Sequence, residues 1–270
     1  MAVQLSDLLA ALETEGAALD AVVAELEDTA WLTPTPAEGW TVAAQIAHLG
    51  WTNGQALRAL RDPEGFGAWV LEGRERLSTL VDDEAQAGAS AAPLQVLGRW
   101  RTSRAELSDA LAALPEGTRI PWFGPPMNAS SMATARLMET WAHGLDVTDA
   151  LGLPPSASDR LRHVAHLGVR TRDFAFAQHG VPAPAEPFHV ELTAPDGAVW
   201  TWGPEDADQR VTGPALDFCL RVTRRRHRDD LALQADGADA DRWLDLAQAF
   251  AGPAGDERPA VGVRAPDAQA

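Results

Sequence analysis

The stretch Arg136-Leu-Met-Glu139-Thr-Trp-Ala-His143-Gly-Leu-Asp146-Val147 places a carboxylate and an imidazole four residues apart. Side chains with this spacing lie on the same face of a helix, so Glu139 and His143 can converge on one ion. The alternative for Glu139 is an ion pair with Arg136 or with another Arg of the same bundle. We interpret the rest of the chain as the frame that positions this pair.

Apolar residues at helical spacing predict four long helices, at residues 5–26, 42–60, 94–114 and 129–151. Thr41 is a suitable N-cap for the second of them. A shorter apolar segment, 66–77, lies between the second and the third. Long helices connected in this way favour an up-down bundle, whose facing helices can build a site in the core.

The segment 115–128 is too rich in Pro and Gly to be regular, and it carries Trp122, Phe123 and Met127. A long irregular loop at the mouth of a bundle is often functional, so these three side chains are candidates for a substrate pocket. The alternative is a lid that only covers the end of the bundle. Trp51 is a further pocket candidate, and its alternative is plain packing in the core.

After Pro155 the pattern changes to that of a small α+β domain. It predicts, in chain order, a helix at 158–174, strands at 189–193 and 199–202 joined by a turn at 195–197, a helix at 214–225, a strand at 231–234 and a helix at 240–250. We therefore expect a helical bundle at 1–152, an α+β domain at 153–252 that starts with a bridging helix, and a disordered tail at 253–270.

The net charge indicates which partners to expect, and the cysteine content indicates the compartment. A formal net charge of −17 repels polyanions, and nucleic-acid binding draws most of its affinity from neutralising phosphates, so we expect no nucleic-acid partner. The one basic run, 224–228, is followed at once by acidic residues and is interpreted as a solvated helix end, with anion binding as its alternative. Cys219 is the only cysteine, and its apolar neighbours predict a buried structural thiol in a reducing compartment.

The chain starts without a basic segment followed by an apolar block, so no signal peptide is expected. No apolar run approaches the ~20 residues of a membrane-spanning helix. We expect a cytoplasmic protein that acts on a small molecule, without a membrane partner. The oligomeric state is left open.

His48 is a third candidate ligand beside Glu139 and His143. Taken alone, it is more often a hydrogen-bonded core histidine than a ligand, because its neighbours are small or apolar. If the second and fourth helices face each other, however, His48, Glu139 and His143 form a His-Glu-His set, a known catalytic zinc set that leaves a fourth position for water or substrate. A buried carboxylate without a partner is very unfavourable, and a divalent cation compensates it directly.

Two stretches, 39–49 (Gly-Trp-Thr-Val-Ala-Ala-Gln-Ile-Ala-His-Leu) and 138–147 (Met-Glu-Thr-Trp-Ala-His-Gly-Leu-Asp-Val), resemble the signature stretches of the mycothiol-dependent maleylpyruvate isomerase family. This family belongs to the DinB-like metal-binding bundle superfamily. Residues 200–206 and 211–220 resemble an actinobacterial branch of metal-binding relatives. The resemblance implies a DinB-like four-helix bundle followed by a small α+β domain of the sterol-carrier-protein-like kind.

The resemblance also implies a zinc ion held by His48, Glu139 and His143. Relatives use the open position to bind a low-molecular-weight thiol, commonly mycothiol, which loses its proton on the metal. They transfer this thiol or add it to an electrophile. Asp146 is a candidate second-shell acceptor for a ligand imidazole, and its alternative is an ion pair with an exposed Arg.

In the isomerase, the smaller domain contributes an Arg that binds the substrate carboxylate. The Arg residues in the corresponding neighbourhood are Arg221, Arg224, Arg225 and Arg226. We take Arg221 and Arg225 as the candidates for binding a substrate anion.

Three hypotheses of function follow. The first is a zinc-dependent transferase or isomerase that uses a thiol, probed by zinc content and by a His143→Ala variant. The second is a zinc hydrolase or lyase that needs no thiol. The third is a non-catalytic metal-binding or sensing module, which a closed shell of four protein ligands would favour.

Overall fold

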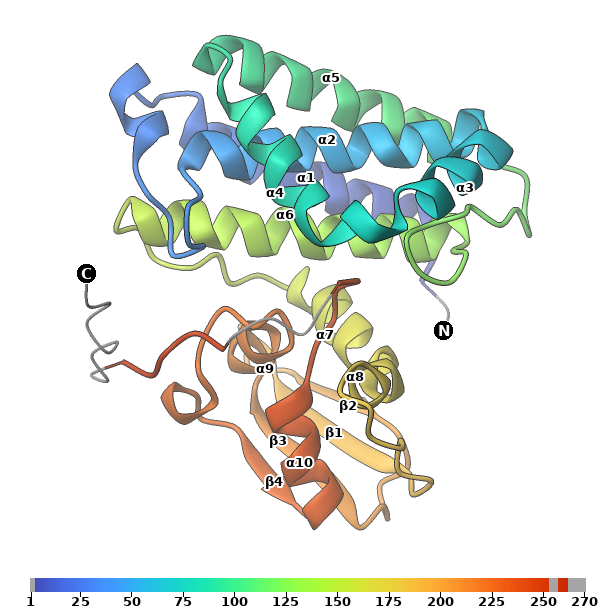
Figure 1. The fold of residues 1–270 in the computed structure, drawn as a ribbon. Helices are drawn as coiled ribbons and strands as arrows, with labels where there is room; N and C mark the ends of the chain where they lie inside the picture. The colour runs from blue at the N-terminus through green and yellow to red at the C-terminus, as the bar shows by residue number, and fades with distance from the viewer. Residues whose placement is uncertain (1–2, 253–256, 262–270) are drawn as a thin grey trace. The chain divides into compact units, whose positions relative to one another are not determined.

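The computed structural model describes residues 3–252 and 257–261, and the chain divides into two compact units, Met1–Ser156 and Ala157–Ala270. The first unit is helical, and the second combines a four-stranded sheet with helices, which confirms the predicted α+β class (Figure 1). Most of the predicted disordered tail, at 253–256 and 262–270, lies outside the described residues. Within the described part of the chain, no helix combines the length and apolar character needed to cross a bilayer.

Four long helices build the first unit: α1 (Leu5–Val23), α2 (Val42–Arg61), α5 (Pro93–Ala112) and α6 (Ala129–Ala150). Both α1 and α2 pack against α5 and α6. The predicted cap is present, since Thr41 Oγ1 accepts a hydrogen bond from the backbone N–H of Ala44. The four predicted helices are thus confirmed, although the first ends at Val23 and not at residue 26.

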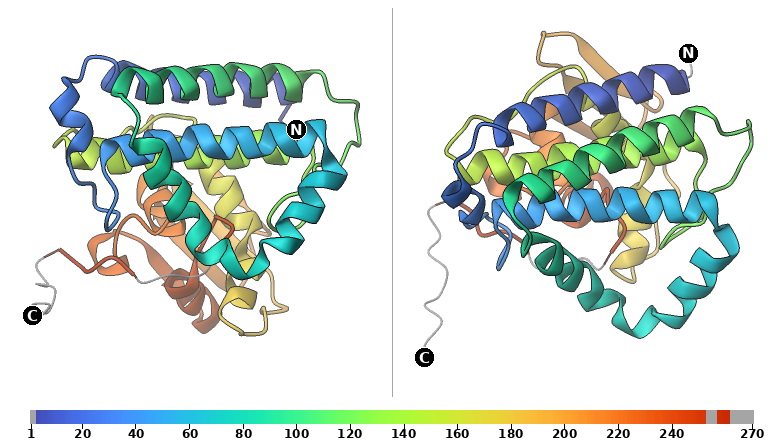
Figure 2. Two further views of the ribbon diagram at one scale, coloured as in Figure 1. Left: turned by 45° about the horizontal axis from the view of Figure 1, so that its top comes forward. Right: turned by 90° about the horizontal axis from the view of Figure 1, so that it is seen from above.

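The short segment predicted between the second and third long helices is in fact two helices, α3 (Pro63–Glu72) and α4 (Leu77–Ala89). Figure 2 shows them as the arms of a V that leaves the end of α2 and returns to the start of α5. Asp62 caps α3 through the backbone N–H of Gly65, and α4 packs against α2. Short 3-10 turns at Asp28–Leu32 and Arg74–Arg76 complete the unit.

Two apolar clusters fill the bundle, one toward each end. The members of the first include Leu8, Leu57, Phe66, Leu107, Ile120, Trp122 and Met132. The members of the second include Leu19, Trp31, Ile46, Leu49, Trp100 and Val147. On α6 the two clusters leave the stretch from residue 134 to 146 between them. The polar side chains of the opening stretch therefore lie in the middle of the bundle, where the apolar clusters on both sides hold the helices together.

The second unit is built around a sheet with strand order β2-β1-β3-β4. Its elements are α7 (Leu161–Arg170), α8 (Arg172–Gln178), β1 (Phe188–Thr193), β2 (Val199–Trp202), β3 (Gln209–Pro214), α9 (Ala215–Val222), the 3-10 turn Arg228–Asp230, β4 (Gln234–Asp236) and α10 (Ala238–Leu246). The hairpin of β1 and β2 is antiparallel, as predicted, whereas β3 pairs parallel to β1. Trp243 of α10 packs edge-on against Phe188 and Phe218 beneath this sheet.

Three details of the second unit differ from the sequence prediction. The single helix expected at 158–174 is broken at Thr171, whose hydroxyl donates to the backbone carbonyls of Leu167 and Gly168. Strand β3 was not predicted, because only Val211 within it is buried and its sequence shows no alternation of apolar residues. The strand expected at 231–234 lies at Gln234–Asp236.

Candidate metal centre

The two halves of the predicted ligand set come from two facing helices of the bundle. His48 lies in the middle of α2, and its side chain is 7% exposed. Glu139 and His143 lie one turn apart on α6, with 17% and 13% of their side chains exposed. Because α2 packs against α6, the three side chains meet in the interior of the bundle.

Both imidazoles point their Nε2 atoms at the same carboxylate oxygen. Glu139 Oε2 lies 3.1 Å from Nε2 of His143 and 3.6 Å from Nε2 of His48. One ligand atom from each residue lies within 4.8 Å of the other two. Bonds of about 2.0–2.2 Å at tetrahedral angles place neighbouring ligand atoms about 3.4 Å apart, and the two distances to Glu139 Oε2 are close to this value. Within the described residues, no fourth His, Cys, Asp or Glu joins the group.

Burial decides the charge state of these groups. Burial and, after it, the neighbouring His143 lower the pKa of His48, and against the opposing effect of Glu139 they bring it to about 4. Burial alone would raise the pKa of Glu139, but the facing imidazoles of His143 and His48 and the charge of Arg136 hold it well below its usual range. The site thus offers a neutral imidazole and an ionised carboxylate, the protonation states that metal binding requires.

Gln45 fixes the orientation of His143, and this role was not predicted. Nδ1 of His143 lies 2.6 Å from the Gln45 side-chain oxygen, Oε1. Gln45 Nε2 donates to the hydroxyl of Thr35, which in turn donates to the backbone carbonyl of Trp40. This direction of donation makes Oε1 the acceptor, so Nδ1 of His143 carries the hydrogen.

The same tautomer leaves a lone pair on Nε2 of neutral His143, facing Glu139 Oε2. A lone pair and a carboxylate oxygen at 3.1 Å attract each other only when a proton or a cation lies between them. The buried Nδ1 of His48 has no hydrogen-bond partner, and Nε2 is the atom of His48 that faces Glu139. The donor set therefore fits a divalent metal ion at the point where the two Nε2 atoms and Oε2 converge.

We expect a Gln45→Leu variant to bind zinc about 10- to 100-fold more weakly than the wild-type chain, the usual cost of removing an outer partner of a ligand imidazole. Leucine keeps the volume of the fully buried Gln45 side chain but cannot accept the Nδ1 hydrogen. Competition with a chelator measures the affinity. A Gln45→Glu variant, which keeps an acceptor, should bind zinc better than Gln45→Leu. Equal zinc affinities for wild type and Gln45→Leu would contradict the role assigned to this side chain.

The metal-free chain should lose stability in mild acid because of His48. In the unfolded chain this imidazole takes up a proton near pH 6.5, whereas in the folded chain it does so only near pH 4. The stability that the neutral form contributes is therefore complete above about pH 6.5 and is lost as the pH falls toward 4, by about 3 kcal/mol. Urea unfolding of chelator-treated protein at several pH values measures this slope. A His48→Gln variant should show a shallower slope, and an unchanged slope would argue against the assignment.

The predicted aromatic pocket residues form a chain of ring contacts that starts at His48. The ring of Trp51 lies 6.2 Å from that of His48 and stacks on Phe123 at 6.2 Å. Phe123 in turn contacts Trp122, which is buried. Met127 packs against the same apolar cluster, and it forms a short β-bridge with Ile120 that closes the loop on itself.

The other predicted site residues have contacts of their own. Asp146 is completely buried, but the partner of His143 Nδ1 is Gln45 and not this carboxylate. The guanidinium of Arg221 is used within the second unit, where it donates to the carbonyls of Leu244 and Asp245 and pairs with Glu257. Arg225 is half-buried and donates to the carbonyl of Thr223, two residues earlier.

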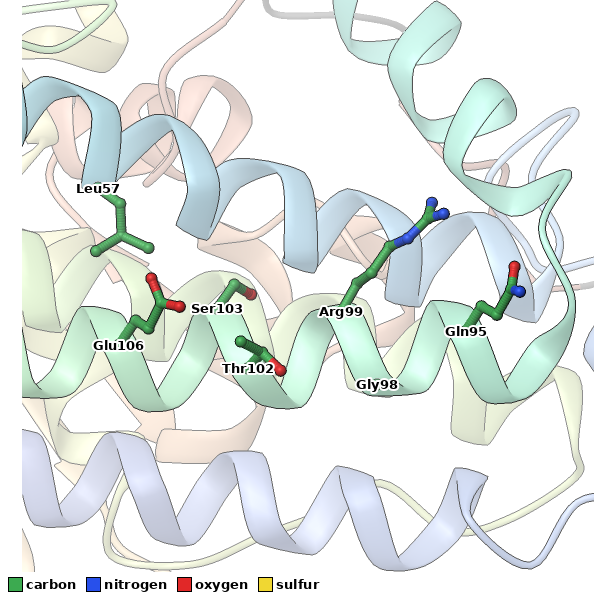
Figure 3. Close-up of a pocket in the computed structure, with 7 residues that line it drawn as sticks. All are labelled: Leu57, Gln95, Gly98, Arg99, Thr102, Ser103 and Glu106. Atoms are coloured by element: carbon green, nitrogen blue, oxygen red, sulfur yellow. The ribbon is translucent and has the colours of Figure 1, made fainter.

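Two grooves of the first unit lie outside the metal centre. One, of about 480 Å³, lies along the outer side of α5 next to Leu57 of α2 (Figure 3). The other, of about 380 Å³, lies between α2, α4 and α5, and Trp51 lines it. Neither is lined by His48, Glu139 or His143.

The buried thiol of Cys219 agrees with its predicted structural role. Its Sγ donates to the backbone carbonyl of Leu161 at 3.5 Å, and burial raises the pKa of the thiol far above its usual range. A thiol in this state does not supply a nucleophile at neutral pH.

Comparison with known proteins agrees with the geometry. Residues 12–148 match the family model described as mycothiol maleylpyruvate isomerase N-terminal domain, and residues 184–236 match one described as wyosine base formation. Two uncharacterized proteins, from two strains of Mycobacterium tuberculosis, are each 54% identical over 247 residues, which cover 92% of this chain and 96% of theirs.

Two crystal structures of a mycothiol-dependent maleylpyruvate isomerase, one of a histidine-to-alanine variant, resemble this chain with TM-scores of 0.60 and 0.59. Each covers 86% of this chain and 93% of its own at 18% identity. At this identity the likeness shows a common fold: a helical bundle followed by a small mixed sheet with helices.

Proposed function

The chain belongs to the mycothiol maleylpyruvate isomerase N-terminal domain family, and from this premise we propose that it is a zinc-dependent enzyme that uses a low-molecular-weight thiol. The thiol, for which mycothiol is the candidate, is transferred or added to an electrophilic small molecule. The observation that carries the proposal is the convergence of two imidazole nitrogens on one oxygen of Glu139, at 3.1 and 3.6 Å.

Three protein ligands favour an open centre over a structural one. Structural zinc sites in proteins are closed by four protein ligands, whereas catalytic sites keep one position for water or substrate. The described residues supply three. A thiol held at such an ion loses its proton near neutral pH, which is the chemistry that a bound zinc would supply here.

Side chains around the three ligands support thiol binding at the open coordination position in three ways. Gln45 holds His143 with its Nε2 turned toward Glu139. The ring of Trp40 stacks on His143 at 5.9 Å, and its indole N–H is anchored by Asp82 of α4. On the other side, Trp51 and Phe123 supply an apolar surface that keeps water away from a bound thiolate and raises its reactivity.

The experiment is a titration of the cobalt-substituted full chain with mycothiol. Sulfur bound to cobalt gives a charge-transfer absorption in the near ultraviolet, and we expect this band to saturate at one thiol per chain. A His143→Ala variant serves as the control without a complete ligand set. Absence of the band at saturating mycothiol would reject the thiol and leave hydrolase or lyase chemistry through metal-bound water, or metal binding without catalysis.

A further inference from the structure

One face of helix α4, the arm of the V that returns to α5 (Figure 2), packs against Trp40, the residue before the cap of α2. Asp82 Oδ1 accepts a hydrogen bond from the indole N–H of Trp40 at 2.9 Å, and Ala85 joins Trp40 in a cluster of buried apolar residues. One turn after Asp82, the side-chain amide of Gln86 donates to the carbonyl of Gly39 at 2.8 Å. Positions 82, 85 and 86 share one side of a helix, so a single face of α4 holds the loop ahead of α2.

The ring of Trp40 contacts both candidate ligand imidazoles. It lies edge-on to His48 with ring centroids 5.2 Å apart, and it stacks on His143 at 5.9 Å with an angle of 18° between the planes. Trp40 is 8% exposed, so its ring is a buried wall of the metal centre. Because both imidazoles pack against one rigid ring, the position of that ring limits how far either ligand can turn away from Glu139.

The backbone of Trp40 is tied to His143 by a second route. The carbonyl of Trp40 accepts hydrogen bonds from the backbone N–H of Thr35, at 2.8 Å, and from the Thr35 hydroxyl. This hydroxyl accepts from the side-chain amide of Gln45, whose oxygen lies 2.6 Å from Nδ1 of His143. Trp40 therefore reaches His143 on its face through the indole ring, and at its edge through Thr35 and Gln45.

We infer that α4 is a clamp on the metal centre, and that Asp82 is a positioning residue for the ion held there. Asp82 acts through Trp40, because its carboxylate fixes the indole ring and the ring fixes the directions of His48 and His143. An ion held by the two imidazoles fixes the ring in return, so metal binding and the docking of α4 stabilise each other. The inference rests on the metal part of the proposed function and does not depend on the thiol.

The test measures the zinc affinity by chelator competition and the visible spectrum of the cobalt-substituted full chain. We expect Asp82→Ala to bind zinc about 3- to 30-fold more weakly than the wild type, the size typical of a residue that acts on a site through its neighbours. Its cobalt absorption bands should shift, because these bands report the geometry of the ligands around the ion. Asp82→Asn keeps an oxygen that can accept the indole N–H, and it should restore both the affinity and the spectrum.

The matched control is Asp83→Ala, since Asp83 is the exposed neighbour of Asp82 on the same helix and its removal changes the charge equally. This variant should keep the wild-type affinity and spectrum. In a Trp40→Phe chain, which keeps an aromatic ring but has no indole N–H, Asp82→Ala should cause no further loss of zinc affinity. An equal loss in both backgrounds would overturn the route through the indole. A lower affinity of Asp82→Ala with unmoved cobalt bands would indicate a purely structural Asp82 and would also overturn the clamp.

Hydrogen exchange tests the coupling between the ion and α4 directly. On zinc loading, the backbone amides of α4 should exchange more slowly in the wild type, and this protection should be smaller in Asp82→Ala. A wild type that binds neither zinc nor cobalt would remove the metal centre, and the clamp with it. A wild type that binds both, with Asp82→Ala equal to it in affinity, spectrum and exchange, would overturn the clamp alone. No thiol enters these measurements, so failure of the thiol proposal leaves the clamp in place.

Discussion

A His143→Ala variant is expected to lose stoichiometric zinc, with an affinity more than about a hundredfold below that of the wild type. The loss should exceed that caused by removing an outer partner, which already costs about 10- to 100-fold. Removing the imidazole takes away one of the two nitrogens that face Glu139 Oε2 and leaves Gln45 without its donor. Elemental analysis after dialysis gives the zinc content, and chelator competition gives the affinity.

The control for this result is His166→Ala, which removes an exposed histidine of α7 in the second unit. This variant should retain one zinc per chain. Circular dichroism of both variants should match the wild type, since a substitution that unfolds the bundle would also release metal. A folded His143→Ala chain that still holds one zinc would remove the basis of the proposed function.

Two of the three candidate ligands were predictable because Glu139 and His143 are only four residues apart in the sequence. Helical spacing alone places Glu139 and His143 on one face, and it requires no knowledge of how the helices pack. His48 was a weaker prediction, since it depends on α2 facing α6. The resemblance to a known family supplied that pairing, and the structure agrees with it.

Neither Gln45 nor Arg136 was assigned a role at the metal centre from the sequence. Gln45 lies one turn before His48 and is a polar residue within an otherwise apolar, buried stretch of α2, which is a signal that sequence reasoning can use. Whether it faces His143 depends on the rotation of α2 about its axis, which spacing does not give. An ion pair between Arg136 and Glu139 was the alternative to a metal site, and in the structure Glu139 faces the two histidines instead.

The second unit was harder to predict because its sheet depends on pairing between distant segments. Strand β3 lies between β1 and β4, and its position is set by backbone hydrogen bonds to both neighbours. Such bonds need no particular side chain, so Gln209–Pro214 carries almost no signal of its own. Arg221 is a similar case: it was a candidate for binding a substrate anion, whereas its side chain is buried and donates to backbone carbonyls of the second unit.

The other large effect is expected for Arg221→Met, which should lower the free energy of unfolding of the second unit by about 3–5 kcal/mol. The Arg221 side chain is fully buried and donates to two backbone carbonyls of the segment at the end of α10. Methionine fills much of the volume but leaves these carbonyls and the carboxylate of Glu257 without their donor. Chemical unfolding followed by tryptophan fluorescence measures the loss.

Arg221 and Arg136 are thus opposite cases of a buried arginine. Arg221 has its donors satisfied inside its own unit, so its removal should cost stability. The buried Nε and Nη1 of Arg136 have no hydrogen-bond partner among the described residues, so Arg136→Met should cost less stability than Arg221→Met. Arg162→Met, at an exposed position of the second unit, controls for loss of charge and should change stability by less than about 0.5 kcal/mol. An Arg221→Met chain as stable as the wild type would contradict the structural role assigned to this guanidinium.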